Sequence, residues 1–159
     1  MSEALAEADA VIHSAGVAHT MSGVPEDDYR LLNTEATIKL ARAAERAGVR
    51  RFVFLSSIRA QSGSTADSVL HEALEPRPTD AYGRSKLAAE QGLAETNLDW
   101  VALRLVLVYG PGVQGNMARL ADLARSPYPL PLASLKAKRS LLSLDNLVSA
   151  DVVTADGRA

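Results

Sequence analysis

The sequence predicts an α/β fold in which helices cover both faces of a parallel sheet. Three apolar segments of strand length, residues 8–16, 50–57 and 98–110, alternate with two segments of helical periodicity, residues 25–48 and 81–96. Strands that are apolar along most of their length are typical of sheets buried on both faces, and parallel strands need a long crossover that a helix usually supplies. The 159 residues are the length of one domain.

The first strand and the first helix have clear local signals. Residues 8–16 read ADAVIHSAG, an apolar run that ends in small residues and predicts a buried strand followed by a tight turn. Pro25 and acidic residues open the helix, and Gly48 ends it where glycine is preferred. The apolar positions of this helix recur at Leu31, Leu32, Ala36, Leu40, Ala43 and Ala44. His13 lies inside the apolar strand and is interpreted as a core histidine.

The remaining elements continue the alternation. Residues 50–57 predict a second buried strand that ends in a serine pair, and residues 98–110 predict a third. Between them, residues 58–80 are predicted as a loop and residues 81–96 as a helix. The last third of the chain predicts a helix near residues 117–125, then a proline-rich link and the short apolar segment SLLSLDNLV. The carboxyl ends of the strands are where such sheets bind ligands.

Tyr82 and Lys86 are the first residues that indicate chemistry. They lie four residues apart in a predicted helix, so they share one face, with Cβ atoms roughly 5–6 Å apart. A nearby cation favours the phenolate, so we expect Lys86 to lower the pKa of Tyr82 and to allow proton exchange near neutral pH. Ser57 ends the preceding strand and is placed to hold a substrate oxygen. The set suits interconversion of an alcohol and a ketone, with a cofactor carrying the hydride.

A plainer reading stays open, in which Tyr82 begins a helix and Lys86 is a solvated surface residue. Composition excludes several other functions. The chain has no cysteine and three histidines without metal-ligand spacing, so neither a cysteine nucleophile nor a metal site is expected. A net charge of −2 gives no indication of a nucleic-acid partner. The longest apolar run is far below the ~20 residues of a membrane span. The N-terminal segment lacks the layout of a signal peptide, so the cytoplasm is the expected compartment.

Five segments, in order along the chain, resemble the extended short-chain dehydrogenase/reductases, a group of NAD-dependent epimerases, dehydratases and ketoreductases. They are ADAVIHSAG, NTEATIKLARAAERAGVRRFVFLSS, AYGRSKLAAEQ, LRLVLVYGPG and RSLLSLDNLV, and they span most of residues 8–150. The last third is most similar to the branch that acts on UDP-N-acetylhexosamines and their 4-keto-6-deoxy derivatives. The resemblance implies a Rossmann-like fold, NAD or NADP as the cofactor and a UDP-sugar as the substrate.

The resemblance also implies roles for individual residues. Tyr82 matches the catalytic acid/base, Lys86 matches its partner, which also binds the nicotinamide ribose, and Ser57 matches the serine that polarises the substrate oxygen. Cofactor contacts are implied for Ala15, Gly16, Asn33, Ser56, Tyr82, Lys86 and the segment from Leu105 to Val108. Substrate contacts are implied for Arg139, whose fork suits a diphosphate, and for Asn116. Two alternatives stay open: Ala15 and Gly16 form only a tight turn, and Asn33 bonds a neighbouring loop.

The sequence departs from this family at both ends. It contains no GxxGxxG turn, so the N-terminal strands of the family's sheet are expected to be missing, and its C-terminal part is short. Residues 1–112 are expected to form the C-terminal half of a Rossmann-like domain, and residues 113–159 the start of a truncated substrate-binding portion. The fold expected is therefore a partial, doubly wound parallel sheet with flanking helices. An open sheet edge favours a homodimer or larger species, and the absent phosphate cradle predicts weak binding of NAD or NADP.

Two functions remain open at the level of sequence. The first is an NAD(P)-dependent nucleotide-sugar epimerase or ketoreductase, in which a hydride moves at the sugar C4 and Tyr82 is the acid/base. The second is a catalytically inactive, truncated family remnant that self-associates through its open sheet edge. The retained Ser57, Tyr82 and Lys86 favour the first function, and the missing glycine turn favours the second.

Overall fold

The predicted parallel sheet is present in the structure, a computed structural model that describes residues 5–18, 23–112, 116–125, 127 and 138–157. Its three strands are β1 (Ala10–His13), β2 (Arg51–Ser57) and β3 (Trp100–Leu105), paired in parallel in that order. Among the described residues, the outer edges of β1 and β3 pair with no further strand. Self-association through such an edge stays a prediction.

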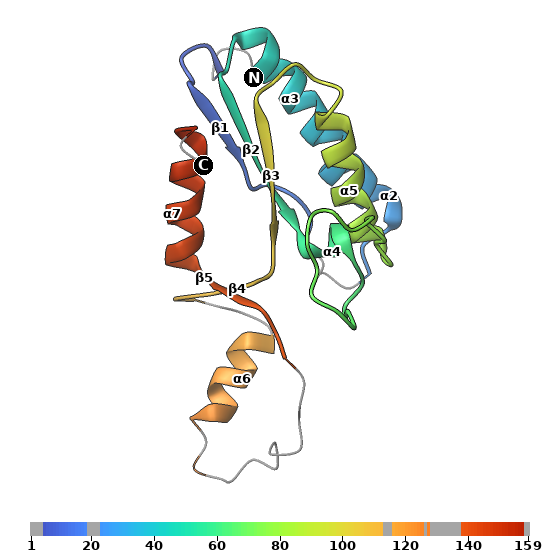
Figure 1. Cartoon of the computed structure of the whole chain (residues 1–159), viewed down its shortest axis with the longest axis vertical. Helices are drawn as coiled ribbons and strands as arrows, with labels where there is room; N and C mark the ends of the chain where they lie inside the picture. Colours follow the sequence, from blue (N-terminus) through green and yellow to red (C-terminus); the bar gives the residue numbers. More distant parts are fainter. Residues whose placement is uncertain (1–4, 19–22, 113–115, 126, 128–137, 158–159) are drawn as a thin grey trace.

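Helices lie on both faces of this sheet (Figure 1). Helices α3 (Ala36–Ala47) and α5 (Ala81–Leu93) pack on one face, around the buried rings of Phe52 and Phe54. Helix α7 (Leu144–Ala155) packs against β1 and β2, and Arg51 Nε donates to the backbone oxygen of Thr154 at 3.0 Å. Because successive side chains of a strand alternate between faces, Arg51 and Phe52 place α7 on the face opposite to α3 and α5. The predicted doubly wound α/β arrangement is confirmed.

The predicted helix at residues 25–48 is one helical segment in three parts. It begins with α2 (Glu26–Tyr29), passes through a π-helical turn, η1 (Arg30–Glu35), and continues as α3. It ends at Gly48, whose φ of 77° is the left-handed conformation that favours glycine. The buried apolar face expected on this helix is wrong at the start of the helix. There Leu31, Leu32 and Ala36 are exposed, and the buried residues are Asn33, Thr34 and Thr37. A π turn holds more residues than an α turn, so it changes which side chains face inward.

The third predicted strand is two strands that belong to different sheets. Strand β3 ends at Leu105, whereas β4 (Leu107–Tyr109) pairs in parallel with β5 (Leu141–Ser143). Leu105 lies opposite Ser57, the last residue of β2, and from Ser57 the chain turns into α4 (Ile58–Gln61). The segment that continues beyond Leu105 therefore has no partner on β2, and the single strand predicted at residues 98–110 is wrong. Helix α4 itself lies in a segment that was predicted as a loop.

The last third contains the helix expected near residues 117–125, which is α6 (Asn116–Ala124). The segment predicted only as short and apolar is β5 followed by α7, a helix of 12 residues. Ser143 caps α7, and its Oγ accepts from the backbone N–H of Asn146 at 3.2 Å. Helix α7 lies in the predicted second domain, residues 113–159, yet it packs against β1 and β2 of the predicted first domain, residues 1–112. The domain boundary at residue 112 stays a prediction. No helix in the described part of the chain has the length and apolar character needed to cross a membrane.

Candidate active site

Four of the predicted site residues meet at the carboxyl ends of β1 and β2. Ser57 is the last residue of β2, Gly16 lies in the turn after β1, and Tyr82 and Lys86 lie on the first turns of α5. The Ser57 side chain is hydrogen-bonded to Tyr82. A Cβ atom built on Gly16 would lie 3.7 Å from Lys86 Nζ. The structure therefore brings a hydroxyl, a phenol and an ammonium group together at the edge of the sheet where the sequence placed them.

The start of α5 is held close to the end of β2 by contacts that the sequence reasoning missed. Asp80 caps α5 by accepting from the backbone N–H of Gly83 at 2.7 Å, and it also pairs with Arg59 of α4. A Cβ atom at Gly83 would lie 2.3 Å from the backbone oxygen of Arg59, so only glycine permits this approach of helix to helix. The glycine directly after the tyrosine in AYGRSK is the sequence signal that indicates this close approach.

The Ser57 hydroxyl has a fixed orientation because it also caps a helix. Its Oγ accepts from the backbone N–H of Arg59 at 3.2 Å at the start of α4, and the residue is buried. A serine oxygen that accepts at a cap still has its O–H to donate. A hydrogen bond given to a phenol oxygen favours the phenolate, and the bond with Ser57 does lower the pKa of Tyr82.

The pKa of Tyr82 is nevertheless raised above its ordinary value, mainly because burial disfavours the phenolate. Asp80 and Tyr29 also raise it, and Arg59 lowers it. Lys86 does not contribute to this shift, so the expectation that Lys86 would lower the pKa of Tyr82 is wrong for the ligand-free chain. Lys86, whose own pKa is about 8, has lost its charge by the pH at which such a phenol ionises, so it no longer favours the phenolate. At neutral pH, Tyr82 is therefore a protonated phenol, which can act as a general acid.

Lys86 is buried, which rules out the reading of a solvated surface lysine. Its Nζ donates to the backbone oxygen of Leu55 at 3.0 Å and lies 4.6 Å from the ring centroid of Phe54. Burial lowers the pKa of Lys86 to about 8, and the charge of Glu90 opposes that shift. An ammonium group has three N–H donors, and the contact with Leu55 uses one of them.

Asn33 binds the turn that follows β1. Its Oδ1 accepts from the backbone N–H of Val17 at 2.7 Å, and its Nδ2 donates to Val17 O and to Ser85 Oγ, each at 3.1 Å. The side chain is fully buried, and a Cβ at Gly16 would lie 2.7 Å from Oδ1. Both amide hydrogens of Asn33 are thus used within the chain. The loop-bonding alternative describes these contacts, and a cofactor contact by Asn33 stays a prediction.

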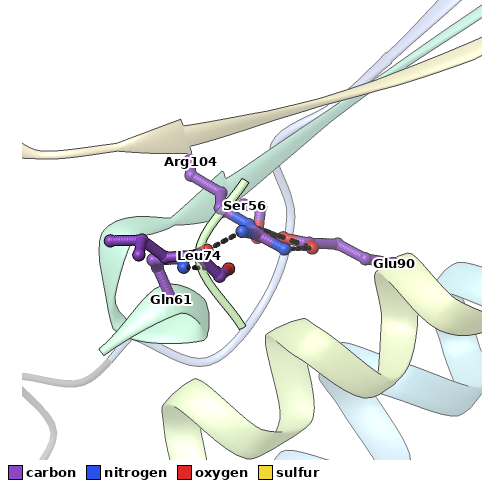
Figure 2. A network of polar contacts seen from close by, with 5 residues as sticks. All are labelled: Ser56, Gln61, Leu74, Glu90 and Arg104. Carbon is purple, nitrogen blue, oxygen red and sulfur yellow. Dashed lines mark hydrogen bonds and ion pairs between the residues drawn. The ribbon is translucent and has the colours of Figure 1, made fainter. Parts of the chain in front are cut away.

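The other candidate residues are less closely connected to this set. Ser56 is buried, and its Oγ donates to Glu90 Oε1 at 2.5 Å (Figure 2). Leu105 and Val108 are half-buried, in β3 and β4. Arg139 is exposed shortly before β5, and the side chain of Asn116 lies outside the described residues. The cofactor and substrate roles of these residues stay predictions.

The turn at Ala15 and Gly16 and the histidine in β1 lie next to this set of residues. Ala15 and Gly16 form an exposed turn, and the φ of 155° at Gly16 is rare for residues that carry a side chain. His13 is buried, its Nε2 lies 2.9 Å from Thr37 Oγ1, and its ring stacks on Phe54. Burial, with the nearby charge of Lys86, lowers the pKa of His13, as expected for a neutral core histidine.

Known proteins match this chain over nearly all of its length. The model of the NAD dependent epimerase/dehydratase family matches residues 1–156. UDP-glucose 4-epimerase of Vibrio cholerae is 38% identical over 155 residues, which cover 92% of this chain and 47% of that protein. UDP-glucose 4-epimerase of Azospirillum brasilense is 31% identical over 154 residues, covering 94% of this chain and 43% of that one. The chain thus spans about half the length of these relatives.

A solved structure shows the same fold. MoeE5 in complex with UDP-glucose and NAD is 31% identical to this chain and superposes on it with a TM-score of 0.78, covering 99% of this chain and 55% of MoeE5. The parallel sheet with helices on both faces is therefore part of a larger Rossmann-type domain in that neighbour. On the match over residues 1–156, the chain belongs to the NAD dependent epimerase/dehydratase family.

Proposed function

We propose that this chain carries the catalytic half of an NAD(P)-dependent nucleotide-sugar epimerase that acts at the sugar C4. The observation that supports this most strongly is the hydrogen bond between Ser57 and Tyr82 at the carboxyl end of β2, with buried Lys86 one helical turn away. Family membership and the UDP-glucose 4-epimerases among the relatives support the reaction and the substrate class. The narrower prediction of a UDP-N-acetylhexosamine substrate, and the choice between epimerase and ketoreductase, belong to this proposal.

The residues at the site fit the nicotinamide side of a dinucleotide. The turn at Gly16 exposes backbone without a side chain, which allows a ligand to approach closely. Lys86 Nζ lies at this turn and has donors beyond the one used by Leu55, so it suits the hydroxyl groups of a ribose. When bound, NAD would supply the acceptor and donor of the C4 hydride. The residues assigned here lie on the nicotinamide side and do not distinguish NAD from NADP, so both cofactors are retained.

The chain's own residues handle the proton of the C4 oxygen. Tyr82 and Ser57 together hold that oxygen, Ser57 by its fixed hydroxyl and Tyr82 by its phenol. For the C4 hydroxyl to become a ketone, Tyr82 first gives up its own proton to water, and the resulting phenolate takes the proton of the hydroxyl. When the ketone is reduced, the Tyr82 phenol returns that proton. Because its pKa is raised, Tyr82 carries its proton in the ligand-free site. It is therefore ready for the second of these steps, in which it protonates the ketone oxygen.

A hybrid enzyme tests the proposal directly. The N-terminal half of the Vibrio cholerae relative is joined to residues 1–156 of this chain, and conversion of UDP-glucose and of UDP-N-acetylglucosamine is followed by NMR with NAD present. We expect interconversion of the C4 epimers of at least one of the two sugars, and its loss in the Tyr82→Phe hybrid. A folded hybrid that binds NAD but converts neither sugar would overturn the proposal.

A further inference from the structure

The face of α5 that carries Tyr82 and Lys86 also carries Glu90, a carboxylate that the proposed chemistry does not use. Glu90 lies one helical turn after Lys86 and is buried. Its Oε1 accepts from Arg104 Nε at 3.1 Å and its Oε2 accepts from Arg104 Nη2 at 2.6 Å, which is a forked, two-oxygen pairing. Ser56 Oγ donates to the same carboxylate at 2.5 Å (Figure 2).

Arg104 extends this contact to other elements. It lies opposite Ser56 in the register of β2 and β3, so the two side chains share one face of the sheet. Its Nη1 also contacts Gln61 Oε1 of α4, and Gln61 Nε2 donates to Leu74 O at 2.7 Å (Figure 2). One guanidinium group thus connects β3 with α4 and α5, the two helices that border Ser57.

Three contacts attach successive turns of α5 to the last three residues of β2. Tyr82 is bonded to Ser57, Lys86 to the backbone oxygen of Leu55, and Glu90 to Ser56. Successive turns of a helix are 5.4 Å apart along a rigid axis, so a slide or rotation of α5 would displace all three contacts together. The first two contacts involve groups that a substrate and a cofactor must reach. The contact of Glu90 is held inside the protein by Arg104.

The cavity that Glu90 and Arg104 line is a different one from the candidate active site. Its other lining residues include Gln61, Trp100 and Leu103, and none of Ser57, Tyr82 and Lys86 is among them. Glu90 and Arg104 therefore do not face the space in which Tyr82 would meet a sugar. An effect of this ion pair on the reaction therefore passes through the placement of α5 or through the charge of Glu90, and not through contact with the sugar.

We propose that the Glu90–Arg104 ion pair is a positioning element that fixes α5 against the carboxyl end of β2 and so aligns Tyr82 and Lys86 with Ser57. The inference rests on the proposed function for the roles of those three residues, but the alignment itself is measurable without catalysis. A buried ion pair adds little stability over apolar residues of similar volume, whereas its forked geometry allows one relative orientation. The charge of Glu90 acts on the site as well, because it counters the effect of burial on Lys86.

The test uses NMR on the ligand-free 159-residue chain. The double variant Glu90→Met with Arg104→Met replaces the ion pair by apolar side chains of similar length. The matched control is Glu26→Met with Arg84→Met, which removes an exposed ion pair between Arg84 of the same helix and Glu26 of α2, whose side chains are 49% and 68% exposed. Two quantities are measured: the nuclear Overhauser effect between the Tyr82 ring and the Ser57 Cβ protons, and the pKa of Lys86 from its carbon-13 shift.

We expect the Glu90/Arg104 double variant to remain folded, to lose the Tyr82–Ser57 signal and to show a lower pKa for Lys86 than the parent. The control variant should keep both at their parental values. A folded double variant that retains the Tyr82–Ser57 signal would overturn the inference whatever the pKa of Lys86, because loss of the Glu90 charge lowers that pKa without any movement of α5.

A second variant covers the case in which the double variant does not fold. Glu90→Gln keeps the shape of the side chain and an oxygen for Ser56 and Arg104, but removes the charge and the forked pairing. It should weaken the Tyr82–Ser57 signal and lower the pKa of Lys86, and a parental Tyr82–Ser57 signal would again contradict the inference. An inactive hybrid enzyme with an intact Tyr82–Ser57 signal would count against the proposed function alone, so the two failures are distinguishable.

Discussion

Asn33 Oδ1 accepts a hydrogen bond from the backbone N–H of Val17 at 2.7 Å, and Asn33 Nδ2 returns one to the backbone oxygen of the same residue at 3.1 Å. The turn after β1 is thereby tied to the π-helical turn, in which Asn33 lies. Through Ser85, whose Oγ accepts from Asn33 and donates to Tyr82 O at 2.8 Å, the same contact reaches the start of α5. The backbone on either side of the candidate active site is therefore held by one buried amide.

Asn33→Ala should destabilise the chain by about 3 kcal/mol, because it leaves the part-buried backbone N–H and oxygen of Val17 without this partner, at about 1–3 kcal/mol for each group. Urea unfolding of the variant and the parent measures the difference. Asn97→Ala is the control, since Asn97 is exposed and its side chain donates to Glu45 at the surface. Equal losses in the free energy of unfolding would show that the hydrogen bonds of Asn33 stabilise the fold no more than the exposed bond of Asn97 does.

Tyr82→Phe should reduce the kcat of the hybrid enzyme by about 10²–10⁴-fold, because the ring remains while the exchangeable proton is lost. The variant also loses its hydrogen bond with Ser57, so the free energy of unfolding should fall by no more than about 1 kcal/mol. Steady-state kinetics and thermal unfolding give the two values. Tyr109→Phe, at an exposed tyrosine of β4, is the control and should change neither. Parental turnover by the Tyr82 variant would remove Tyr82 from the mechanism.

Gly83→Ala should destabilise the chain, although alanine is the better helix former by about 1 kcal/mol. The new Cβ would lie 2.3 Å from the backbone oxygen of Arg59, and such overpacking typically costs about 1–3 kcal/mol. Gly92→Ala, in the same helix, makes a matched comparison, because its Cβ would meet the terminal methyl of Ile38 at 2.3 Å. A side-chain end can move aside and a backbone oxygen cannot, so the loss of stability on urea unfolding should be larger at Gly83. The reverse order would contradict this account of the contact between α4 and α5.

Lys86 should make stability depend on pH in the alkaline range. Burial lowers its pKa from 10.5 to about 8 in the folded chain, so between these values the unfolded state binds more protons than the folded state. The free energy of unfolding should therefore rise as the pH increases from about 8 to 10. Tyr82, whose pKa is raised by folding, acts in the opposite sense only above about pH 10. Urea unfolding at several pH values should show a flatter profile for Lys86→Met, and an unchanged slope would mean that Lys86 is not the titrating group.

The 159-residue chain by itself should bind NAD with a Kd no better than about 1 mM, near −4 kcal/mol. Its sequence has no GxxGxxG turn to offer backbone N–H groups to the pyrophosphate, so the contacts left are those on the nicotinamide side. Those contacts must also offset several kcal/mol lost on immobilising the ligand. Fluorescence titration with NADH measures the affinity, and the hybrid enzyme should bind much more tightly. Micromolar binding by the chain alone would contradict this expectation.

The sequence by itself determined the alternation of strands and helices and the edge of the sheet at which the candidate residues meet. Both follow from short-range rules: apolar runs of strand length become buried parallel strands, and residues four apart on a helix share a face. For this reason, the sequence alone places Ser57, at the end of a strand, together with Tyr82 and Lys86 on the next helix. The glycine stop at Gly48 is equally local, because its positive φ requires no distant partner.

The tertiary structure decided what depends on partners far away in the chain. Strand β3 stops at Leu105 because β2, its neighbour, stops at Ser57, and no pattern within residues 98–110 records that length. The pKa of Tyr82 rises because burial outweighs the hydrogen bond of Ser57 and the charge of Arg59, and Lys86 on the same helical face bonds the backbone oxygen of Leu55. The pairing of Glu90 with Arg104 likewise needs two elements to be packed before either side chain has its partner. Spacing along one helix predicts which residues are neighbours, and only packing decides which of those neighbours interact.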